Sequence, residues 1–344
     1  MSETMGETAT QNPTQTSGET DYEARKRQQI AQYGNNHLRF FPPKAHAIWM
    51  QEYMWAKVRE VFGAHSVAQF YGGPLKDRTR VRVLSVGSGD GQVEVAIVRH
   101  LLDQGVRDVS MTVTELSPIR QARTRALVER EGLGERFRYE IVDFNEAFVE
   151  GTFDLVFAHH VLHHIVELEL LYANIHAALA DDGYFSSVDM IGRNGHQRWP
   201  EALKYTEMAW AFVPDHWKHN FQFNAFHERY LDHDCAVSGF EGVRAQDVLP
   251  LLLERFDFSG FVAGGGFHDV MIDRGYGQSI DVNKPGEAAL VRFLSEMNEM
   301  LLETGRVKPT MMFAQMRKKG AMEGRAAAVH GNMTPEFAVR PTGD

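Results

Sequence analysis

One short stretch near residue 85 constrains this 344-residue chain more than any other part of it. The segment 83–86 is an apolar run rich in valine, and it leads directly into a turn with glycines at positions 87, 89 and 91. A helical pattern follows from Gln92 to Leu102. This order is typical of a buried parallel strand, a tight turn and a helix N-terminus. Because glycine has no Cβ, such a turn lets the backbone approach a ligand closely.

The spacing of the glycines separates two classes of nucleotide-binding turn. The dinucleotide fingerprint G-x-G-x-x-G needs its third glycine where this chain has Gln92, which disfavours a nicotinamide-dependent oxidoreductase. The spacing G-x-G-x-G after a strand instead resembles the first motif of the class I S-adenosylmethionine (SAM)-dependent methyltransferases. A strand-to-helix turn that binds no ligand is the alternative.

Three further sequence motifs extend the resemblance along the chain. Glu115 ends the alternating segment 109–114, about twenty residues after the glycines, where a carboxylate suits the two hydroxyls of a ribose. A charge favoured by the dipole of the next helix is the alternative for Glu115. Asp143 and Phe144 follow the next strand, where the resemblance implies contacts with adenine. The segment 153–165 resembles the family's fourth strand and the Leu-His-His turn after it.

The resemblance and the alternation of patterns predict an α/β fold. We expect a doubly wound, mostly parallel seven-stranded sheet with N-terminal helices and an aromatic-rich helical insertion after strand 5. Six of the seven expected strands can be placed, at 81–86, 109–114, 136–142, 153–158, 183–189 and, as the antiparallel member inserted beside the sixth, 308–317.

The composition along the chain divides it into six expected segments. They are a disordered tail (1–20), an N-terminal helical cap (21–78), a SAM-binding Rossmann-like core (79–190), a helical lid or substrate insertion (191–239), the completion of the core (240–319) and a flexible C-terminal tail (320–344). The first segment has almost no apolar residues and cannot bury enough surface to offset the cost of ordering.

The resemblance implies SAM as the cofactor and an enzyme of the class EC 2.1.1. The predicted cofactor-binding residues are Gly87, Ser88, Gly89, Gly91, Glu115, Leu116, Asp143, Phe144 and His159. SAM carries its own activated methyl group, so the protein mainly aligns the acceptor and excludes water. A weakly acidic acceptor such as a hydroxyl also needs a general base.

Four histidines, at positions 159, 160, 163 and 164, follow the fourth strand, beside the expected position of the methyl group. Because imidazole suits a base near neutral pH, we predict catalytic roles for His163, His160 and Glu167. Glu167 could instead be a charge in the first turn of a helix. Histidines four residues apart could share a helix face and hold a metal, although we assign no metal ligands. Asp189, at the end of the fifth strand, is expected at the same edge of the sheet.

The insertion 191–239 mixes aromatic with basic residues. The predicted substrate-contacting residues are Arg193, Arg198, Trp199, Trp210 and Trp217. Such a mixture fits a substrate that is apolar at one end and anionic at the other, such as an isoprenoid diphosphate methylated at carbon, which could bring Mg²⁺. Methylation of oxygen or nitrogen in a sugar or natural product is the alternative. The insertion could also be a hydrophobic subdomain or an oligomer contact.

Charge and composition exclude several classes of function. The formal net charge of −10 disfavours binding to nucleic acid, and no apolar run is long enough to span a bilayer. Cys235 is the only cysteine, so neither an intrachain disulfide nor a cysteine metal cluster is possible. We therefore expect a cytoplasmic enzyme of small-molecule biosynthesis that could assemble as a homo-oligomer. A non-catalytic SAM-fold scaffold, with the insertion buried against another chain, is the less favoured alternative.

Overall fold

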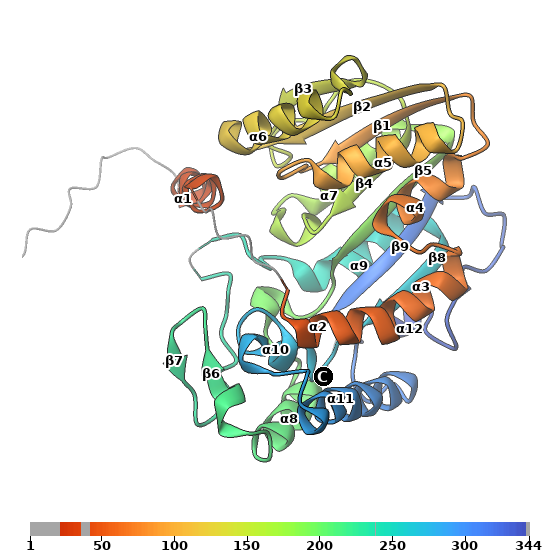
Figure 1. Cartoon of the computed structure of the whole chain (residues 1–344). Coiled ribbons are helices and arrows are strands. Elements are labelled where there is room, and N and C mark those ends of the chain that lie inside the picture. Colours follow the sequence, from red (N-terminus) through yellow and green to blue (C-terminus); the bar gives the residue numbers. More distant parts are fainter. Residues whose placement is uncertain (1–20, 36–41, 238, 342–344) are drawn as a thin grey trace, which may run out of the picture.

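An eight-stranded sheet forms the centre of the molecule in a computed structural model that describes residues 21–35, 42–237 and 239–341 (Figure 1). The strands follow the spatial order β10-β8-β9-β5-β4-β1-β2-β3. They are β1 (Arg80–Val86), β2 (Asp108–Glu115), β3 (Phe137–Ile141), β4 (Phe153–His159), β5 (Leu179–Met190), β8 (Phe256–Gly264), β9 (Met311–Lys318) and β10 (Ala328–Val329). Only β9 is antiparallel to its neighbours, β5 and β8. The α/β fold with a mostly parallel, doubly wound sheet is therefore confirmed.

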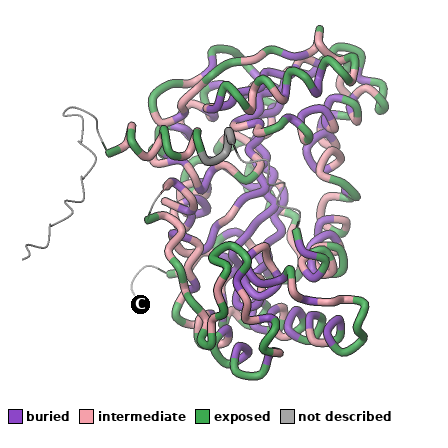
Figure 2. Tube along the Cα trace, turned by 60° about the vertical axis from the view of Figure 1, so that its left-hand side comes forward, coloured by how far each residue is buried: buried purple, intermediate pink, exposed green. Residues whose placement is uncertain are grey.

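Helices cover the sheet because most crossovers between parallel strands return through one, although the connection from β3 to β4, residues 142–152, has none. The helices are α1 (Asp21–Asn35), α2 (Lys44–Trp49), α3 (Trp55–Phe62), α4 (Val67–Gly72), α5 (Gln92–Asp103), α6 (Pro118–Arg130), α7 (Leu168–Ala178), α8 (Pro200–Trp210), α9 (Ala245–Arg255), α10 (Asp269–Ile272), α11 (Pro285–Glu303) and α12 (Pro335–Ala338). A π-helical turn, Met50–Met54, joins α2 to α3, so residues 44–62 of the expected helical cap form one nearly continuous helix. The burial pattern in Figure 2 follows this architecture, since the buried positions concentrate on the central strands.

The strands are apolar because both of their faces are covered. Val83, Leu84, Leu155 and Val156 are fully buried, and the register pairs Val83 with Leu155 across β1 and β4. Since all the parallel strands run the same way, the segments after β1, β2, β4 and β5 emerge at one edge. This carboxyl edge carries the glycine turn, Glu115 and the histidine-rich segment.

Two features differ from the sequence expectation. The sheet has eight strands instead of seven, because Ala328–Val329 adds the short strand β10 in parallel to β8. The same segment, expected as a flexible tail, continues into α12, where Thr334 caps the helix by accepting a hydrogen bond from the amide of Phe337. Pro335 and Ala338 of α12 are buried, so apolar contacts order a segment whose composition is weakly apolar. The expected tail 1–20 lies outside the described residues.

The insertion after β5 contains a helix, α8, and a two-stranded hairpin, β6 (His219–Asn220) with β7 (Ala225–Phe226). Several large apolar side chains of this part are exposed: Met208, Phe212, Phe221, Phe223, Phe226, Leu231 and Val237. No helix among the described residues combines the length and apolar character needed to cross a bilayer.

Candidate functional site

The glycine turn has the backbone conformation that its sequence requires. Gly87, Gly89 and Gly91 all have positive φ values, of 71°, 58° and 79°. A Cβ on Gly91 would lie 2.5 Å from the side chain of Thr124, and one on Gly87 would lie 2.6 Å from Val161. The turn is therefore limited to glycine by both conformation and space.

Glu115 is held directly against this turn. Its carboxylate accepts a hydrogen bond from the amide of Gly89 at 2.8 Å and another from the amide of Ser117 at 3.0 Å. The amide of Ser88 also binds the carbonyl of Thr114, so the ends of β1 and β2 are joined at this point. Burial raises the pKa of Glu115, although the neighbouring Arg120 guanidinium opposes this rise.

Three further predicted cofactor residues lie around the turn. Ser88 is buried, and its hydroxyl has no hydrogen-bond partner among the described residues. Leu116 is half-buried next to Glu115, and His159, at the end of β4, contacts the hydroxyl of Tyr71 through Nδ1 at 3.1 Å. An unpaired buried hydroxyl is costly unless a ligand or water satisfies it. These features fit a bound nucleoside.

Asp143 and Phe144 follow β3, and the amide of Val142 binds the carbonyl of Glu115 at 3.4 Å. Asp143 therefore lies one strand away from Glu115 at the same edge. Its carboxylate binds Lys26 Nζ at 2.6 Å and the hydroxyl of Tyr22 at 2.8 Å. Burial alone would raise the pKa of Asp143, but these two donors lower it.

Helix α1 connects Asp143 with the end of the insertion. The Tyr22 ring lies 5.4 Å from the ring of Phe240, and the guanidinium of Arg25 lies 5.1 Å from the same ring. Arg25 also donates a hydrogen bond to the carbonyl of Ala236 at 2.9 Å. The leading helix thus bridges Asp143, after β3, and the end of the insertion.

The histidine-rich segment after β4 is organised by Asp189, at the end of β5. The fully buried carboxylate of Asp189 accepts hydrogen bonds from the amides of residues 161, 162, 163 and 190, at 2.8 to 3.3 Å. It also contacts His163 Nδ1 at 2.5 Å. Burial alone would lower the pKa of His163, but the Asp189 carboxylate outweighs it and raises the pKa to about 9. The Asp189 carboxylate therefore favours the protonated form of His163, which is the form that cannot accept a proton.

The other two predicted catalytic residues occupy different environments. His160 is exposed, has a left-handed φ of 54° and packs on the ring of His159 at 4.9 Å. Desolvation of the ring by the protein around it lowers the pKa of His160, which favours the neutral imidazole. Glu167 is exposed at the N-terminus of α7, and its amide binds Asn145. Its side chain is placed as a helix-terminal charge and not as part of the histidine cluster.

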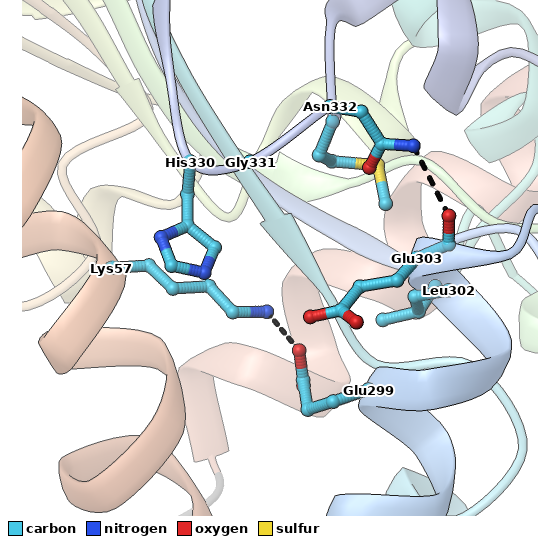
Figure 3. A pocket seen from close by; sticks show the side chains of 8 residues that line it. Lys57, Glu299, Leu302, Glu303, His330, Gly331 and Asn332 are labelled. Carbon is cyan, nitrogen blue, oxygen red and sulfur yellow. Dashed lines mark hydrogen bonds and ion pairs between the residues drawn. The ribbon is translucent and has the colours of Figure 1, made fainter.

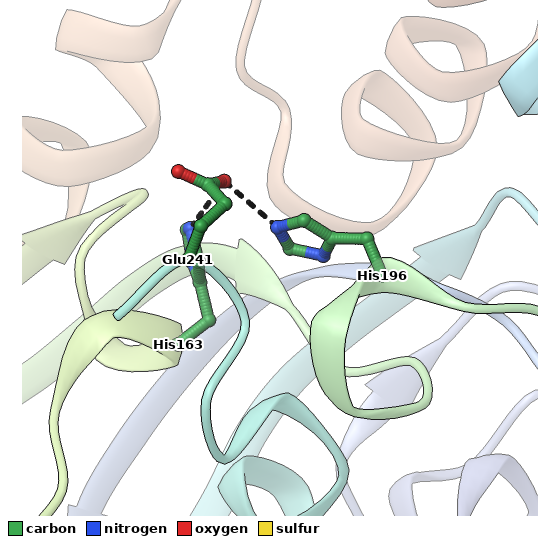
Figure 4. A group of neighbouring side chains, drawn as sticks. All are labelled: His163, His196 and Glu241. Atoms are coloured by element: carbon green, nitrogen blue, oxygen red, sulfur yellow. Dashed lines mark hydrogen bonds and ion pairs between the residues drawn. The ribbon is translucent and has the colours of Figure 1, made fainter. Parts of the chain in front are cut away.

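Two residues from distant segments complete this cluster, as Figure 4 shows. Glu241 Oε1 lies 2.8 Å from His196 Nε2 and 3.6 Å from His163 Nε2. Its second oxygen lies 3.7 Å from His164 Nε2. Burial alone would raise the pKa of Glu241, but these imidazoles hold it well below its usual range. His196 had no assigned role in the sequence interpretation, and no sequence signal singled out Glu241.

Backbone contacts explain why His196 and Glu241 meet. The amide of Gly195 binds the carbonyl of Gly242 at 2.9 Å, and both glycines have positive φ values. A Cβ on Gly242 would lie 3.1 Å from the backbone nitrogen of Gly195. The side chains of Asn194 and Gln246 bind each other's backbone amides on the same contact.

Most of the predicted substrate residues make contacts within the protein interior or with neighbouring side chains. Arg198 is 3 % exposed and binds Asp269 at 2.9 Å, and Trp199 packs under the guanidinium of Arg340. The buried indoles of Trp210 and Trp217 donate hydrogen bonds to the carbonyl of His227 and to Glu287. Arg193, which is partly exposed, lies 3.9 Å from Asp232. Tryptophan is common in cores as well as in binding sites, so composition alone did not separate these two roles.

A separate cavity of about 280 Å³ lies among α3, α11 and the C-terminal segment (Figure 3). Lys57 binds Glu299 beside it, and the side-chain amide of Asn332 donates to the carbonyl of Glu303 at 3.1 Å. None of the predicted site residues lines this cavity.

Comparison with known proteins relates part of the chain to a family of enzyme domains. Residues 84–185 match the family model of a methyltransferase domain. No curated protein matches the chain in sequence.

Several solved structures are similar to the chain at low sequence identity. The N-methyltransferase NodS from Bradyrhizobium japonicum WM9, in complex with S-adenosyl-L-homocysteine, is 12% identical, covers 86% of this chain and 99% of its own, and has a TM-score of 0.44. The O-methyltransferase of a polyketide synthase multienzyme from Brevibacillus brevis is also 12% identical, covers 83% of this chain and 85% of its own, and has a TM-score of 0.43. The [4+2]-cyclase SpnF is 15% identical, covers 73% and 80%, and has a TM-score of 0.43. The family model of a methyltransferase domain thus matches the part of the chain, residues 84–185, that contains the glycine turn and Glu115.

Proposed function

We propose that this protein transfers a methyl group from SAM to an oxygen of a small-molecule acceptor. The observation that carries the proposal is the direct hydrogen bond between the amide of Gly89 and the carboxylate of Glu115. This hydrogen bond joins the glycine turn, which lets a ligand approach the backbone closely, to a carboxylate that can accept hydrogen bonds from ribose hydroxyls. Both lie at the carboxyl edge of the sheet, where ligands bind in open α/β folds.

The residues around this point fit the cofactor. Gly87 and Gly91 leave no room for side chains, and Ser88 offers a buried hydroxyl that is still to be paired. The carboxylate of Asp143, the predicted acceptor for the adenine amino group, accepts hydrogen bonds from Lys26, Tyr22 and Asn145 in this structure, so adenine would replace one of these donors. Bound SAM would supply an activated methyl group on its sulfonium.

The general base for an oxygen acceptor would be His160. Desolvation lowers the pKa of His160 beside His159 and favours its neutral ring, whereas His163 is buried between two carboxylates that favour its protonated form. A neutral imidazole can take the proton of a hydroxyl as the methyl group is transferred. His160 and not His163 is therefore the proposed proton acceptor.

Methylation of an isoprenoid diphosphate at carbon finds less support in the contacts. Arg198 binds Asp269 in the interior, Arg193 lies near Asp232, and Lys218 binds Asp215 at 2.9 Å. Cations that already have carboxylate partners are poorly placed to bind a diphosphate with its Mg²⁺. The hydroxyl acceptor of a sugar or natural product is favoured for this reason.

Calorimetric titration with SAM and with S-adenosyl-L-homocysteine tests the cofactor site. Wild type should bind both ligands, while Gly89→Arg and Glu115→Ala should lose binding. Gly132→Arg is the matched control, because Gly132 also has a positive φ, of 69°, but has nothing within 4 Å of a Cβ. Glu140→Ala, on exposed β3, is the control for the lost carboxylate. Unchanged binding in Glu115→Ala would refute the site.

A panel of acceptors with labelled SAM tests the transfer. We expect incorporation into hydroxyl compounds such as nucleotide sugars and phenols, and a reduced rate in His160→Ala with unchanged SAM binding. Incorporation only into isoprenyl diphosphates would overturn the choice of oxygen as the acceptor. SAM binding without transfer, together with assembly that depends on residues 191–239, would favour the scaffold alternative.

A further inference from the structure

We infer that His163, His196 and Glu241 form a binding site for one divalent transition-metal ion. The nitrogen and oxygen atoms that they offer all lie within 4.8 Å of one another (Figure 4). Two imidazoles and one carboxylate are the ligand set of catalytic zinc sites and of non-haem iron sites.

The distances within the cluster suit a single ion. Ligand atoms that each lie about 2.0–2.1 Å from a tetrahedral ion are separated by about 3.4 Å. The two separations from Glu241 Oε1, of 2.8 Å to His196 and 3.6 Å to His163, lie on either side of this value. Small side-chain rotations therefore suffice to place an ion between the three groups.

The contacts behind His163 are those of a metal-binding imidazole. Asp189 holds the Nδ1 side of the ring at 2.5 Å, so Nε2 is directed toward Glu241. A carboxylate that accepts the proton of the far ring nitrogen fixes the tautomer and makes a histidine a stronger ligand. Asp189 is itself held by four backbone amides, which keeps it in place.

Binding of the ion requires the loss of one proton from the site. The ion replaces the proton on His163 Nε2, the Nδ1 proton stays with Asp189, and one proton is released to solvent. Glu241 is already ionised and needs no proton loss. Glu241 and His196 remain 22% and 17% exposed in their side chains, so the ion would keep a position open to solvent.

The guanidinium of Arg274 lies 3.7 Å from Glu241 Oε1 and is 41% exposed. An oxyanion bound to the open position of the ion would lie within reach of this group. If the proposed function holds, the methyl acceptor would present such an oxygen; the ion site itself is independent of that function.

The experiment uses the full chain after dialysis against a chelator. Titration with Co²⁺ should produce visible d–d absorption that saturates at one ion per chain, and Zn²⁺ should bind the same site by calorimetry. We expect His196→Ala and Glu241→Gln to weaken binding at least tenfold. These two positions are chosen because replacing His163 would leave the buried Asp189 carboxylate unpaired.

His216→Ala is the matched control, since His216 forms a single histidine–carboxylate pair with Glu287 at 3.1 Å outside the cluster. It should bind Co²⁺ as wild type does. Absence of saturable Co²⁺ or Zn²⁺ binding by wild type, or equal binding by the cluster variants, would overturn the inference. Titration of the same samples with S-adenosyl-L-homocysteine separates the two proposals, because failure of the metal site leaves that binding intact.

Discussion

The carboxyl group of Glu94 makes a quantitative prediction about the helix that follows the glycine turn. Glu94 is in the first turn of α5 and is only 2% exposed. One of its oxygens accepts a hydrogen bond from the hydroxyl of Ser85 at 2.6 Å, and the other is buried without a hydrogen-bond partner among the described residues. Burial of a charge that is only half satisfied raises the pKa of Glu94 to about 7, against the opposing effect of Ser85.

The size and sign of the effect on stability follow from this pKa. The difference between the ordinary value of 4.5 and about 7 corresponds to about 3 kcal/mol. The folded protein binds this proton more tightly than the unfolded chain does. The stabilising contribution is therefore fully present below pH 4.5, and it is lost as the pH rises from 4.5 to about 7.

Replacement by glutamine imitates the protonated acid without the titration. We expect Glu94→Gln to be close to wild type at pH 5 and more stable at pH 8, with the difference in the free energy of unfolding growing by about 2–3 kcal/mol between these pH values. Urea unfolding of both proteins at each pH measures this change. Glu140→Gln, at an exposed position, should show no such growth. A difference between Glu94→Gln and wild type that does not change with pH would refute the reasoning.

Two further predictions test the roles of aromatic side chains. Phe240→Ala removes the ring that Tyr22 and Arg25 contact, so amide exchange in α1 should become faster while exchange in β1 stays unchanged; equal exchange in α1 would contradict the bridging role of this helix. Trp217→Phe loses the hydrogen bond to Glu287, so denaturation should show a loss of about 1–3 kcal/mol. The affinity for S-adenosyl-L-homocysteine should not change, and a weakened affinity would contradict a purely structural role for Trp217.

Local patterns were sufficient to predict most of the sheet. The apolar segments 81–86, 109–114 and 153–158 lie within β1, β2 and β4, because strands covered on both faces need continuous apolar runs. The order of these motifs along the chain also predicted that Glu115 would contact the glycine turn, since parallel strands bring their carboxyl ends to one edge of the sheet.

The sequence patterns did not predict the less regular parts of the fold. Strand β10 is only two residues long, and its pairing with β8 depends on a neighbour about seventy residues away, at Gly260 and Phe261. The aromatic residues of the insertion carried no periodicity that separates a core position from a ligand contact. Trp210 and Trp217 turned out to be buried with their indole nitrogens paired.

The sequence by itself determined the class of the core and the edge of the sheet at which the glycine turn meets Glu115. Glycine conformation and the apolar strands are local properties, and they need no knowledge of distant contacts. The tertiary structure alone decided the chemistry beside that edge. His163 received its raised pKa from Asp189, and it met Glu241 and His196 only because the turn at Gly195 packs on the turn at Gly242. Charges and ligands act over a few ångströms in space, and chain separation does not reveal which of them come that close.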